Sequence, residues 1–173
     1  KAILDDAEEL EKYLFVRDYI DIMNEYQVKI SPQEFVDTLS PIAPRLYSIS
    51  SSPKAHLGEI HLTVAIVKYN NFERDRYGLA TGDLARDIEL NKTEVPIYIQ
   101  PTRDFVIPQD GSKDIIMVGP GTGIAPFRAF MEERVSTGAT GRNWLFFGEV
   151  HEESTFFYKD EWFDYMKKGL LTK

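Results

Sequence analysis

The chain has 173 residues, of which 43% are hydrophobic and 28% charged, a composition typical of a globular protein and unlike that of a disordered or collagen-like chain. Its 20 Lys and Arg residues against 28 Asp and Glu give a net charge of −8, and because such a surface repels phosphates we expect no nucleic acid partner. The absence of cysteine excludes disulfides, thiolate catalysis and cysteine-ligated metals. No stretch reads as a membrane span or a signal-peptide core, so we expect a cytoplasmic protein without a membrane partner.

The first segment, residues 1–43, is predicted to be helical. Apolar residues recur at helical spacing from Leu10 to Tyr26, with acidic residues between them. A second helix start is marked by Ser31 as a cap, Pro32 at the first helical position and Glu34 three residues after the serine.

The middle segment, residues 44–112, is predicted to be a sheet or part of a barrel. Apolar residues alternate with others along Arg45–Ser50 and Glu59–Val67, which is the pattern of strands. Three further elements are expected here: a short helix at Leu79–Ile88 and strands at Val95–Gln100 and Phe105–Ile107.

The last segment, residues 113–173, follows a different pattern. Asp114–Val118 is a continuous apolar run, as expected of a strand buried on both faces, and a turn rich in Gly and Pro follows it. The remaining elements are predicted to be a helix at Ile124–Val135, a strand at Asn143–Phe147 and a helix from about Phe156 to Lys167. The order strand, helix, strand, helix indicates a parallel α/β sheet.

The turn Gly119–Pro126 is the strongest candidate for a binding site. It lies between a buried strand and a helix, where backbone amides and the positive end of the helix dipole favour an anionic phosphate. The spacing differs from the Gly-x-Gly-x-x-Gly fingerprint of ordinary NAD sites. The alternative is a glycine-rich turn that only lets the helix pack on the strand.

Arg45, Leu46, Tyr47 and Ser48 form a second candidate. A guanidinium can hold a pyrophosphate, an aromatic ring can stack on a flat heterocycle, and a hydroxyl can bond to a ring atom. Those are the requirements of a flavin nucleotide, although four such residues also occur in ordinary strands. Gly78–Thr81, before a short helix, could present amides to a second phosphate or be a plain turn.

Three other groups are weaker candidates. His56 and His61 are expected to be surface or strand residues. His151 stands beside Glu152 and Glu153, but no second histidine has ligand spacing, and we predict no metal site. Arg128 could meet a phosphate or a carboxylate, or it could be an exposed helix residue.

Taken together, these motifs resemble the ferredoxin–NADP reductase superfamily, and most of all its diflavin branch. The segments that carry the resemblance are Arg45–Ser48, Thr63–Ala65, Gly78–Thr81, Gly119–Pro126 and the strand Asn143–Gly148. The resemblance extends from about Ile42 to Thr172. It implies a connecting helical segment at 1–43, part of an antiparallel FAD-binding β-barrel at 44–112, and the first part of a parallel α/β NADP-binding domain at 113–173.

The resemblance also implies roles for individual residues. Arg45 would bind the FAD pyrophosphate, Tyr47 would lie against the flavin ring, and Ser48 would be the catalytic residue near the nitrogen that accepts hydride. The other implied FAD contacts are Leu46, Thr63, Val64, Ala65, Tyr69, Gly78, Leu79, Ala80 and Thr81. Gly121, Thr122 and Gly123 would approach NADPH.

The implied activity is hydride transfer from NADPH to FAD, followed by electron transfer to FMN on another domain and then to a haem-protein partner. Members of the family extend beyond both ends of this sequence, so we expect the chain to be an internal part of such a reductase, with weak activity or none by itself. Two alternatives stay open: a non-catalytic binding or scaffolding module with the same fold, and a diflavin reductase with a different haem-protein acceptor.

Overall fold

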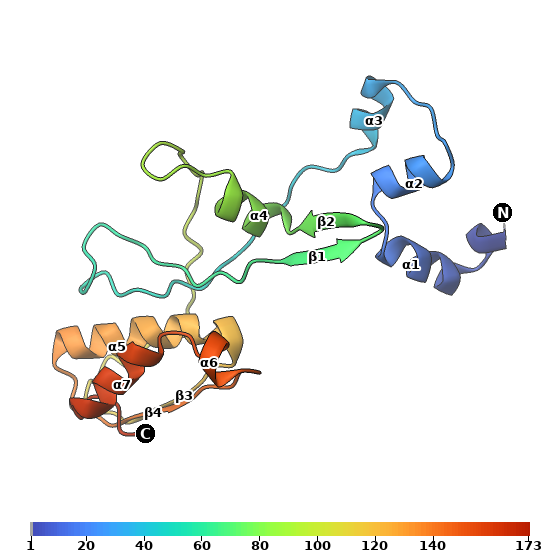
Figure 1. The fold of residues 1–173 in the computed structure, drawn as a ribbon. Coiled ribbons are helices and arrows are strands. Elements are labelled where there is room, and N and C mark those ends of the chain that lie inside the picture. The colour runs from blue at the N-terminus through green and yellow to red at the C-terminus, as the bar shows by residue number, and fades with distance from the viewer. Residues whose placement is uncertain (1) are drawn as a thin grey trace. The chain divides into compact units, whose positions relative to one another are not determined.

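The computed structural model describes residues 2–173, and their contacts divide the chain into two compact units (Figure 1). The first unit contains residues 2–44 and Ile66–Asp87, and the second contains Arg45–Ala65 and Ile88–Lys173. The segment Arg45–Ala65 therefore groups with the C-terminal half of the chain. None of the helices in residues 2–173 is long and apolar enough to cross a membrane.

The first unit is mainly helical. Its helices are η1 (Ala2–Asp5), α1 (Ala7–Phe15), α2 (Tyr19–Glu25), α3 (Pro32–Thr38) and α4 (Leu79–Arg86). The run expected from Leu10 to Tyr26 is divided between α1 and α2, because Asp18 and Asp21 form a reciprocal capping box that begins a new helix. The start predicted at Ser31 is confirmed, since Ser31 Oγ accepts from the Glu34 amide and the Glu34 carboxylate accepts from the Ser31 amide.

A β-hairpin completes the first unit. Strands β1 (Lys68–Asn71) and β2 (Arg74–Tyr77) pair antiparallel, and the two turn residues Phe72 and Glu73 both have positive φ, 49° and 58°. A two-residue turn with both φ positive matches the twist of the strands. This turn was not predicted from the sequence, because neither turn residue is one of the usual Gly or Asn.

The strands predicted in the middle segment are mostly absent from the part of the chain that the structure describes. Arg45–Ser50 and Glu59–Val67 share one isolated antiparallel bridge, Ile49 to Leu62, and neither Val95–Gln100 nor Phe105–Ile107 is a strand. Alternation of apolar residues gives an extended chain with two different faces, whereas a strand also needs a partner along its edge. No closed barrel is formed by residues 2–173.

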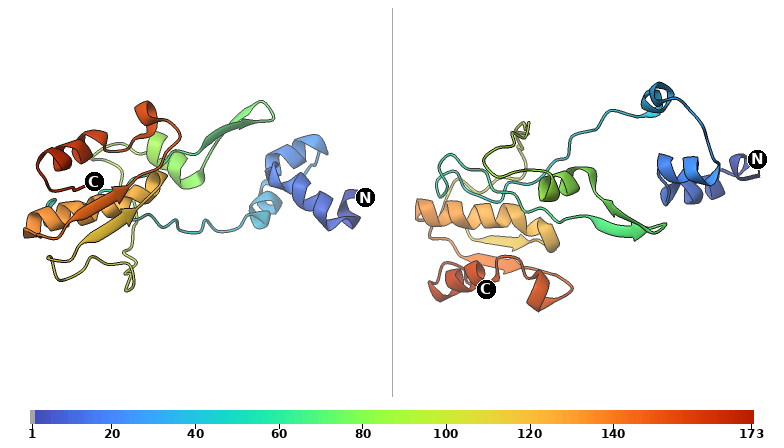
Figure 2. Two further views of the ribbon diagram at one scale, coloured as in Figure 1. Left: turned by 90° about the horizontal axis from the view of Figure 1, so that it is seen from below. Right: turned by 45° about the horizontal axis from the view of Figure 1, so that its top comes forward.

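The second unit has the parallel order predicted from the sequence. Its elements are β3 (Ile115–Val118), η2 (Gly121–Ile124), α5 (Ala125–Thr137), β4 (Asn143–Phe146), α6 (Glu152–Thr155) and α7 (Lys159–Lys167). Strands β3 and β4 are parallel, with Ile115 opposite Asn143 and Val118 opposite Phe146, and α5 lies alongside them (Figure 2). The last helix begins later than expected, because Phe156 and Phe157 pack against the core before the chain turns at Tyr158.

The core of the second unit lies on one face of this small sheet. It consists of Met117, Ile124, Phe127, Met131, Trp162 and Leu171. The expectation that the first strand is buried on both faces is wrong for residues 2–173, since Ile116 and Val118 are 67% and 64% exposed. Helices α5 and α7 supply side chains to the Met117 face only, so the alternate residues of β3 stay in solvent.

Candidate functional site

The glycine loop joins β3 to α5 in the second unit. The Gly119 amide donates to the Phe146 carbonyl and the Gly121 amide donates to the Gly148 carbonyl, both at 3.0 Å, which ties the loop to the carboxyl end of β4. Gly121 has φ of +54°, a conformation that glycine adopts without strain. A Cβ on Gly119 would lie 2.6 Å from the Gly123 carbonyl oxygen, so this position admits only glycine without movement of the chain.

The same loop has properties that fit a dinucleotide. No side chain caps the start of η2 or of α5, so no capping group covers the backbone there; the Gly121, Gly123 and Ala125 amides themselves donate to the Gly148, Pro120 and Thr122 carbonyls. A Cβ on Gly123 or on Gly148 would meet only Pro120, at 3.8 and 3.9 Å, so the backbone there borders open space. Close approach of a pyrophosphate requires both features.

Glu149 is a feature of this loop that the sequence interpretation missed. Its Oε1 lies 3.3 Å from where a Cβ on Gly121 would stand, so a carboxylate borders the loop. A negative charge there opposes a phosphate beside Gly121 and favours hydroxyl or amide donors instead. The signal that could have revealed Glu149 is its position directly after the strand Asn143–Gly148.

Two groups of proposed flavin residues, Arg45–Ser48 and Thr63–Ala65, share the second unit with the glycine loop. Arg45, Leu46 and Ser48 are exposed, and Tyr47 is half-buried. The bridge from Ile49 to Leu62, with the Ser50 amide donating to the His61 carbonyl at 2.8 Å, places Arg45–Ser48 and Thr63–Ala65 on neighbouring antiparallel segments. In that register Ser48 stands opposite Thr63.

Two of the three residues at Thr63–Ala65 are half-buried, and one is already bonded within the protein. The Thr63 hydroxyl lies 2.7 Å from the Tyr158 hydroxyl, at the turn before α7. Val64 is half-buried and Ala65 is exposed. The Thr63 hydroxyl therefore holds this segment to the C-terminal half of the chain.

Arg128 on α5 contacts two carboxylates, one of the alternatives that the sequence left open. Its Nε and Nη2 donate to Glu161 at 2.8 and 3.1 Å, and Nη1 lies 3.0 Å from Glu132 Oε1. Nη1 also donates to the Ser50 carbonyl at 2.8 Å, and the guanidinium stands 4.8 Å from the centre of the Tyr158 ring. Burial alone would lower the pKa of Arg128, but the bonds to Glu161 and the charge of Glu132 raise it above its ordinary value.

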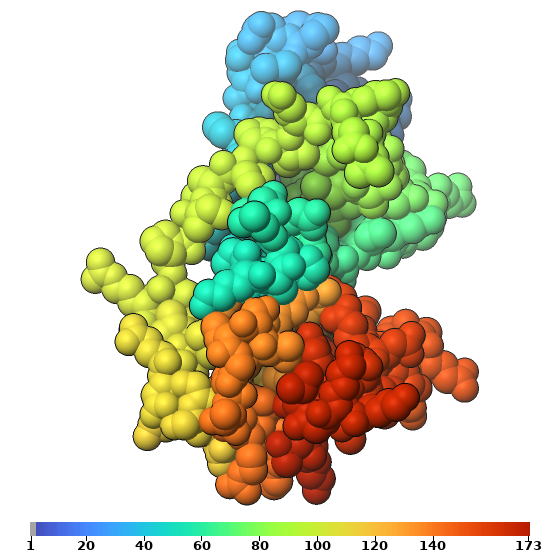
Figure 3. All heavy atoms as spheres, turned by 90° about the vertical axis from the view of Figure 1, so that its left-hand side faces the viewer, coloured from blue at the N-terminus to red at the C-terminus, as the bar shows by residue number. Residues whose placement is uncertain are grey.

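Acidic residues of α5 hold the segment that follows Ser50. The Ser52 amide donates to Glu132 at 2.8 Å and its hydroxyl donates to Glu133 at 2.6 Å, while Lys54 pairs with Glu133 at 2.7 Å. Lys54 and then Ser52 hold the pKa of Glu133 below its ordinary value. Figure 3 shows residues 50–60, in teal, lying directly against the orange helix α5.

Two histidines that we expected to be surface or strand residues belong to this polar cluster. His56 Nε2 lies 3.1 Å from Glu132, and His61 Nε2 lies 2.9 Å from Glu59. His56, Glu59 and His61 bring potential metal-ligand atoms within 4.8 Å of one another. Arg128 Nη1, however, stands 3.4 Å from His61 Nδ1, and this fixed positive charge opposes a cation at the same place.

The other proposed FAD residues, Tyr69 and Gly78–Thr81, belong to the first unit. Tyr69 on β1 is exposed, and so is Leu79 at the start of α4, while Ala80 is half-buried and Thr81 buried. A Cβ on Gly78 would lie 2.7 Å from Thr81 Oγ1, which requires glycine there, and Thr81 Oγ1 accepts from the Val67 amide. Helix α4 begins without a side-chain cap, so its first amides are open to an anion.

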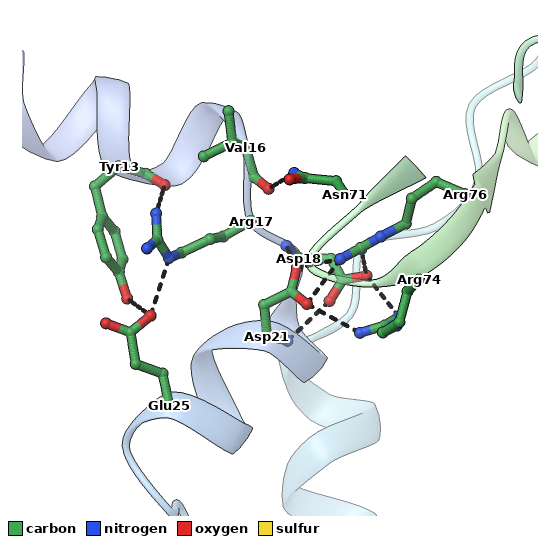
Figure 4. A network of polar contacts seen from close by, with 9 residues as sticks. All are labelled: Tyr13, Val16, Arg17, Asp18, Asp21, Glu25, Asn71, Arg74 and Arg76. Carbon is green, nitrogen blue, oxygen red and sulfur yellow. Dashed lines mark hydrogen bonds and ion pairs between the residues drawn. The ribbon is translucent and has the colours of Figure 1, made fainter. Parts of the chain in front are cut away.

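An ion-pair network fixes the hairpin that leads to α4 (Figure 4). Arg76 binds Asp21 with contacts of 2.6 and 2.7 Å and also contacts Asp18. Arg74 reaches the same two carboxylates at 3.0 and 3.2 Å. Because Arg76 and Arg74 surround it, the pKa of Asp21 is lowered. The hairpin and helix α2 are thus held as one piece.

Comparison with known proteins agrees with this arrangement. The FAD binding domain family model matches residues 6–82, and the oxidoreductase NAD-binding domain model matches residues 117–170. The fold is similar to that of ferredoxin-NADP+ reductase from Plasmodium falciparum, with a TM-score of 0.54 and 24% identity over 73% of this chain and 47% of that one. The chain therefore matches an FAD-binding model followed by an NAD-binding model, on a fold similar to that of a ferredoxin-NADP+ reductase.

Along almost its whole length, the chain is similar to the flavoprotein alpha-component of NADPH sulfite reductase. It is 44% identical over 172 residues to the protein of Mannheimia succiniciproducens and 43% identical over 169 residues to that of Bacillus subtilis. These matches cover 99% and 97% of this chain but 29% and 28% of the relatives. The chain thus spans less than a third of the length of these relatives.

Proposed function

We propose that the protein containing this chain is an NADPH-dependent flavoprotein reductase that delivers electrons to a sulfite reductase haemoprotein. The observation that carries the proposal is the 44% identity to sulfite reductase flavoprotein alpha-components over 99% of the chain, with the FAD and NAD domain matches in the same order. The relatives are more than three times as long, which leaves room for an FMN-binding domain.

We assign FAD binding first to the two antiparallel segments of the second unit. Arg45 would bind the FAD pyrophosphate, Tyr47 would stack on the flavin, and Ser48 would hydrogen-bond near the hydride-accepting nitrogen. The register set by Ile49 and Leu62 supports this assignment, because it puts Ser48 opposite Thr63, so that one ligand could contact both segments. The remaining implied FAD contacts are Leu46, Val64, Ala65, Tyr69, Gly78, Leu79, Ala80 and Thr81.

We assign NADPH binding to the glycine loop, where Gly121, Thr122 and Gly123 would approach the cofactor. The open space beside Gly123 supports it. When bound, the two cofactors supply the redox chemistry, in which NADPH is oxidised and FAD reduced by transfer of a hydride. The protein groups bind and orient the two rings and keep water from between them.

The proposal extends to the domain plan of the parent protein. Residues 1–43 would be the connecting segment, 44–112 part of an antiparallel FAD barrel, and 113–173 the first part of the NADP domain. The extended segments of the middle region have the alternation of barrel strands, and in a longer chain they would find partners along their edges.

A visible spectrum and a reduction assay test the proposal. The purified full-length protein should be yellow, and NADPH added without oxygen should bleach the flavin band. A colourless protein that ignores NADPH would instead identify a non-catalytic module with the same fold. If NADPH bleaches the flavin but the sulfite reductase haemoprotein is not reduced, the acceptor is a different haem protein.

A further inference from the structure

Arg128 is one of the few charged side chains almost fully enclosed by the second unit, with 8% of its surface exposed. It lies in the first turn of α5, the helix that follows directly on the glycine loop. The partners of its guanidinium come from three places: Glu132 on the same helix, Glu161 on α7, and the backbone of Ser50.

The contact with Ser50 connects the two proposed cofactor segments. The Ser50 carbonyl, which accepts from Arg128 Nη1 at 2.8 Å, stands two residues after Ser48. The Ser50 amide donates to the His61 carbonyl, and Thr63 follows two residues later. The Arg128 guanidinium, on the helix that follows the proposed NADPH loop, therefore binds the chain where the two proposed flavin segments pair.

The planar fork of arginine suits this position better than any other side chain. Two parallel bonds to Glu161 fix the plane of the guanidinium, and that plane determines where Nη1 points. Glu132, which accepts from the Ser52 amide, holds the other side of the same segment. A buried cation between two carboxylates is costly to break and resists small displacements.

On the basis of the proposed function, we propose that Arg128 is a positioning residue: it sets the spacing between the flavin segment Arg45–Ser48 and the nicotinamide loop Gly121–Gly123. Hydride transfer depends on that spacing, since a misplacement of about 1 Å can cost on the order of 100-fold in rate. The three guanidinium nitrogens are already engaged by Glu161, Glu132 and Ser50, so we expect the effect of Arg128 to fall on the transfer step and not on the binding of either cofactor.

The test compares Arg128→Gln and Arg128→Lys with the wild type, all as full-length protein loaded with FAD. Arg142→Gln is the matched control, because Arg142 is an exposed arginine of the same unit that pairs with Asp114. Three quantities are measured: the dissociation constant of NADPH, the rate of anaerobic flavin reduction in a stopped-flow instrument, and amide hydrogen exchange of residues 50–61 without cofactors.

We expect Arg128→Gln to slow flavin reduction by roughly 10- to 100-fold, while the NADPH dissociation constant changes less than about threefold. Exchange in residues 50–61 should accelerate. Arg128→Lys keeps the charge but loses the fork, and its rate should fall between those of Gln and wild type. The Arg142→Gln protein should match the wild type in all three measurements.

Folded Arg128→Gln with a wild-type rate of flavin reduction overturns the proposal, and so does a loss of NADPH affinity that accounts for the whole defect. If Arg128→Gln does not fold, Arg128→Lys decides, and a rate within twofold of wild type refutes the positioning role. A wild-type protein that NADPH cannot bleach refutes the proposed function itself, which is a separate outcome.

Discussion

Replacing two glycines of one loop separates its structural role from its binding role. A Cβ at Gly119 would lie 2.6 Å from the Gly123 carbonyl oxygen and 2.7 Å from Phe127 Cδ2, about 0.8 Å inside ordinary contact. The carbonyl belongs to a short helix and the ring to the core, so neither can yield freely. We expect Gly119→Ala to cost about 1 to 3 kcal/mol of stability, the usual penalty of overpacking.

Gly123→Ala is the matched control, four residues away in the same loop. Its Cβ would have a single neighbour, Pro120 Cδ at 3.8 Å, so the folded state accepts it. The loss of glycine freedom in the unfolded chain should make it neutral or stabilising by up to about 1 kcal/mol. The added methyl enters the open space beside the loop, and NADPH binding should therefore weaken.

Thermal unfolding of both full-length variants without NADPH measures the first effect. One kcal/mol shifts the midpoint of a domain of this size by roughly 2 to 4 °C, so Gly119→Ala should unfold roughly 2 to 12 °C below wild type. Titration with NADPH measures the second effect. Equal midpoints for the two variants would refute the packing argument, and unchanged NADPH affinity of Gly123→Ala would refute the placement of the dinucleotide.

Three further substitutions test other contacts. Arg45→Ala should weaken FAD retention by about 1.5 to 3 kcal/mol, the scale of a charged hydrogen bond, and unchanged flavin content after dialysis would contradict the assignment. Asp21→Asn should lower the unfolding midpoint near neutral pH. Arg76 lowers the pKa of Asp21, so the Asp21 carboxylate stabilises the fold at pH values above its ordinary pKa of 3.8. The difference from wild type should shrink as the pH falls through the folded-state pKa. Glu133→Gln should likewise lower the unfolding midpoint above pH 4.5, since Lys54 holds the pKa of Glu133 below that ordinary value. The difference from wild type should shrink as the pH falls through the folded-state pKa, and a difference that persists at low pH would show that the loss is not electrostatic.

The elements that the sequence predicted well are those whose causes are local. The Ser31 capping box, for example, depends on residues within one turn. The strand–helix–strand order of the last segment was also readable, because each element has its own apolar pattern. The hairpin turn at Phe72 and Glu73 was missed, since neither residue favours positive φ by itself.

The parts that could not be predicted depend on residues far apart in the chain. Arg128 meets Ser50 across 78 residues and Glu161 across 33, and no local pattern records either contact. The predicted barrel strands failed for a related reason: alternation sets which side chains face together, but the pairing depends on a neighbour elsewhere in the sequence. The candidate cofactor residues were found through motifs, and their roles stay predictions.

The apolar side chains on the outer face of the β3–β4 sheet affect how the 173-residue chain would behave alone. Ile116, Val118, Trp144 and Phe146 lie on that face and are 39% to 67% exposed. A contiguous exposed apolar surface of this kind promotes self-association. Sedimentation of the isolated polypeptide should therefore quicken as it is concentrated, and a mild detergent should reverse the change.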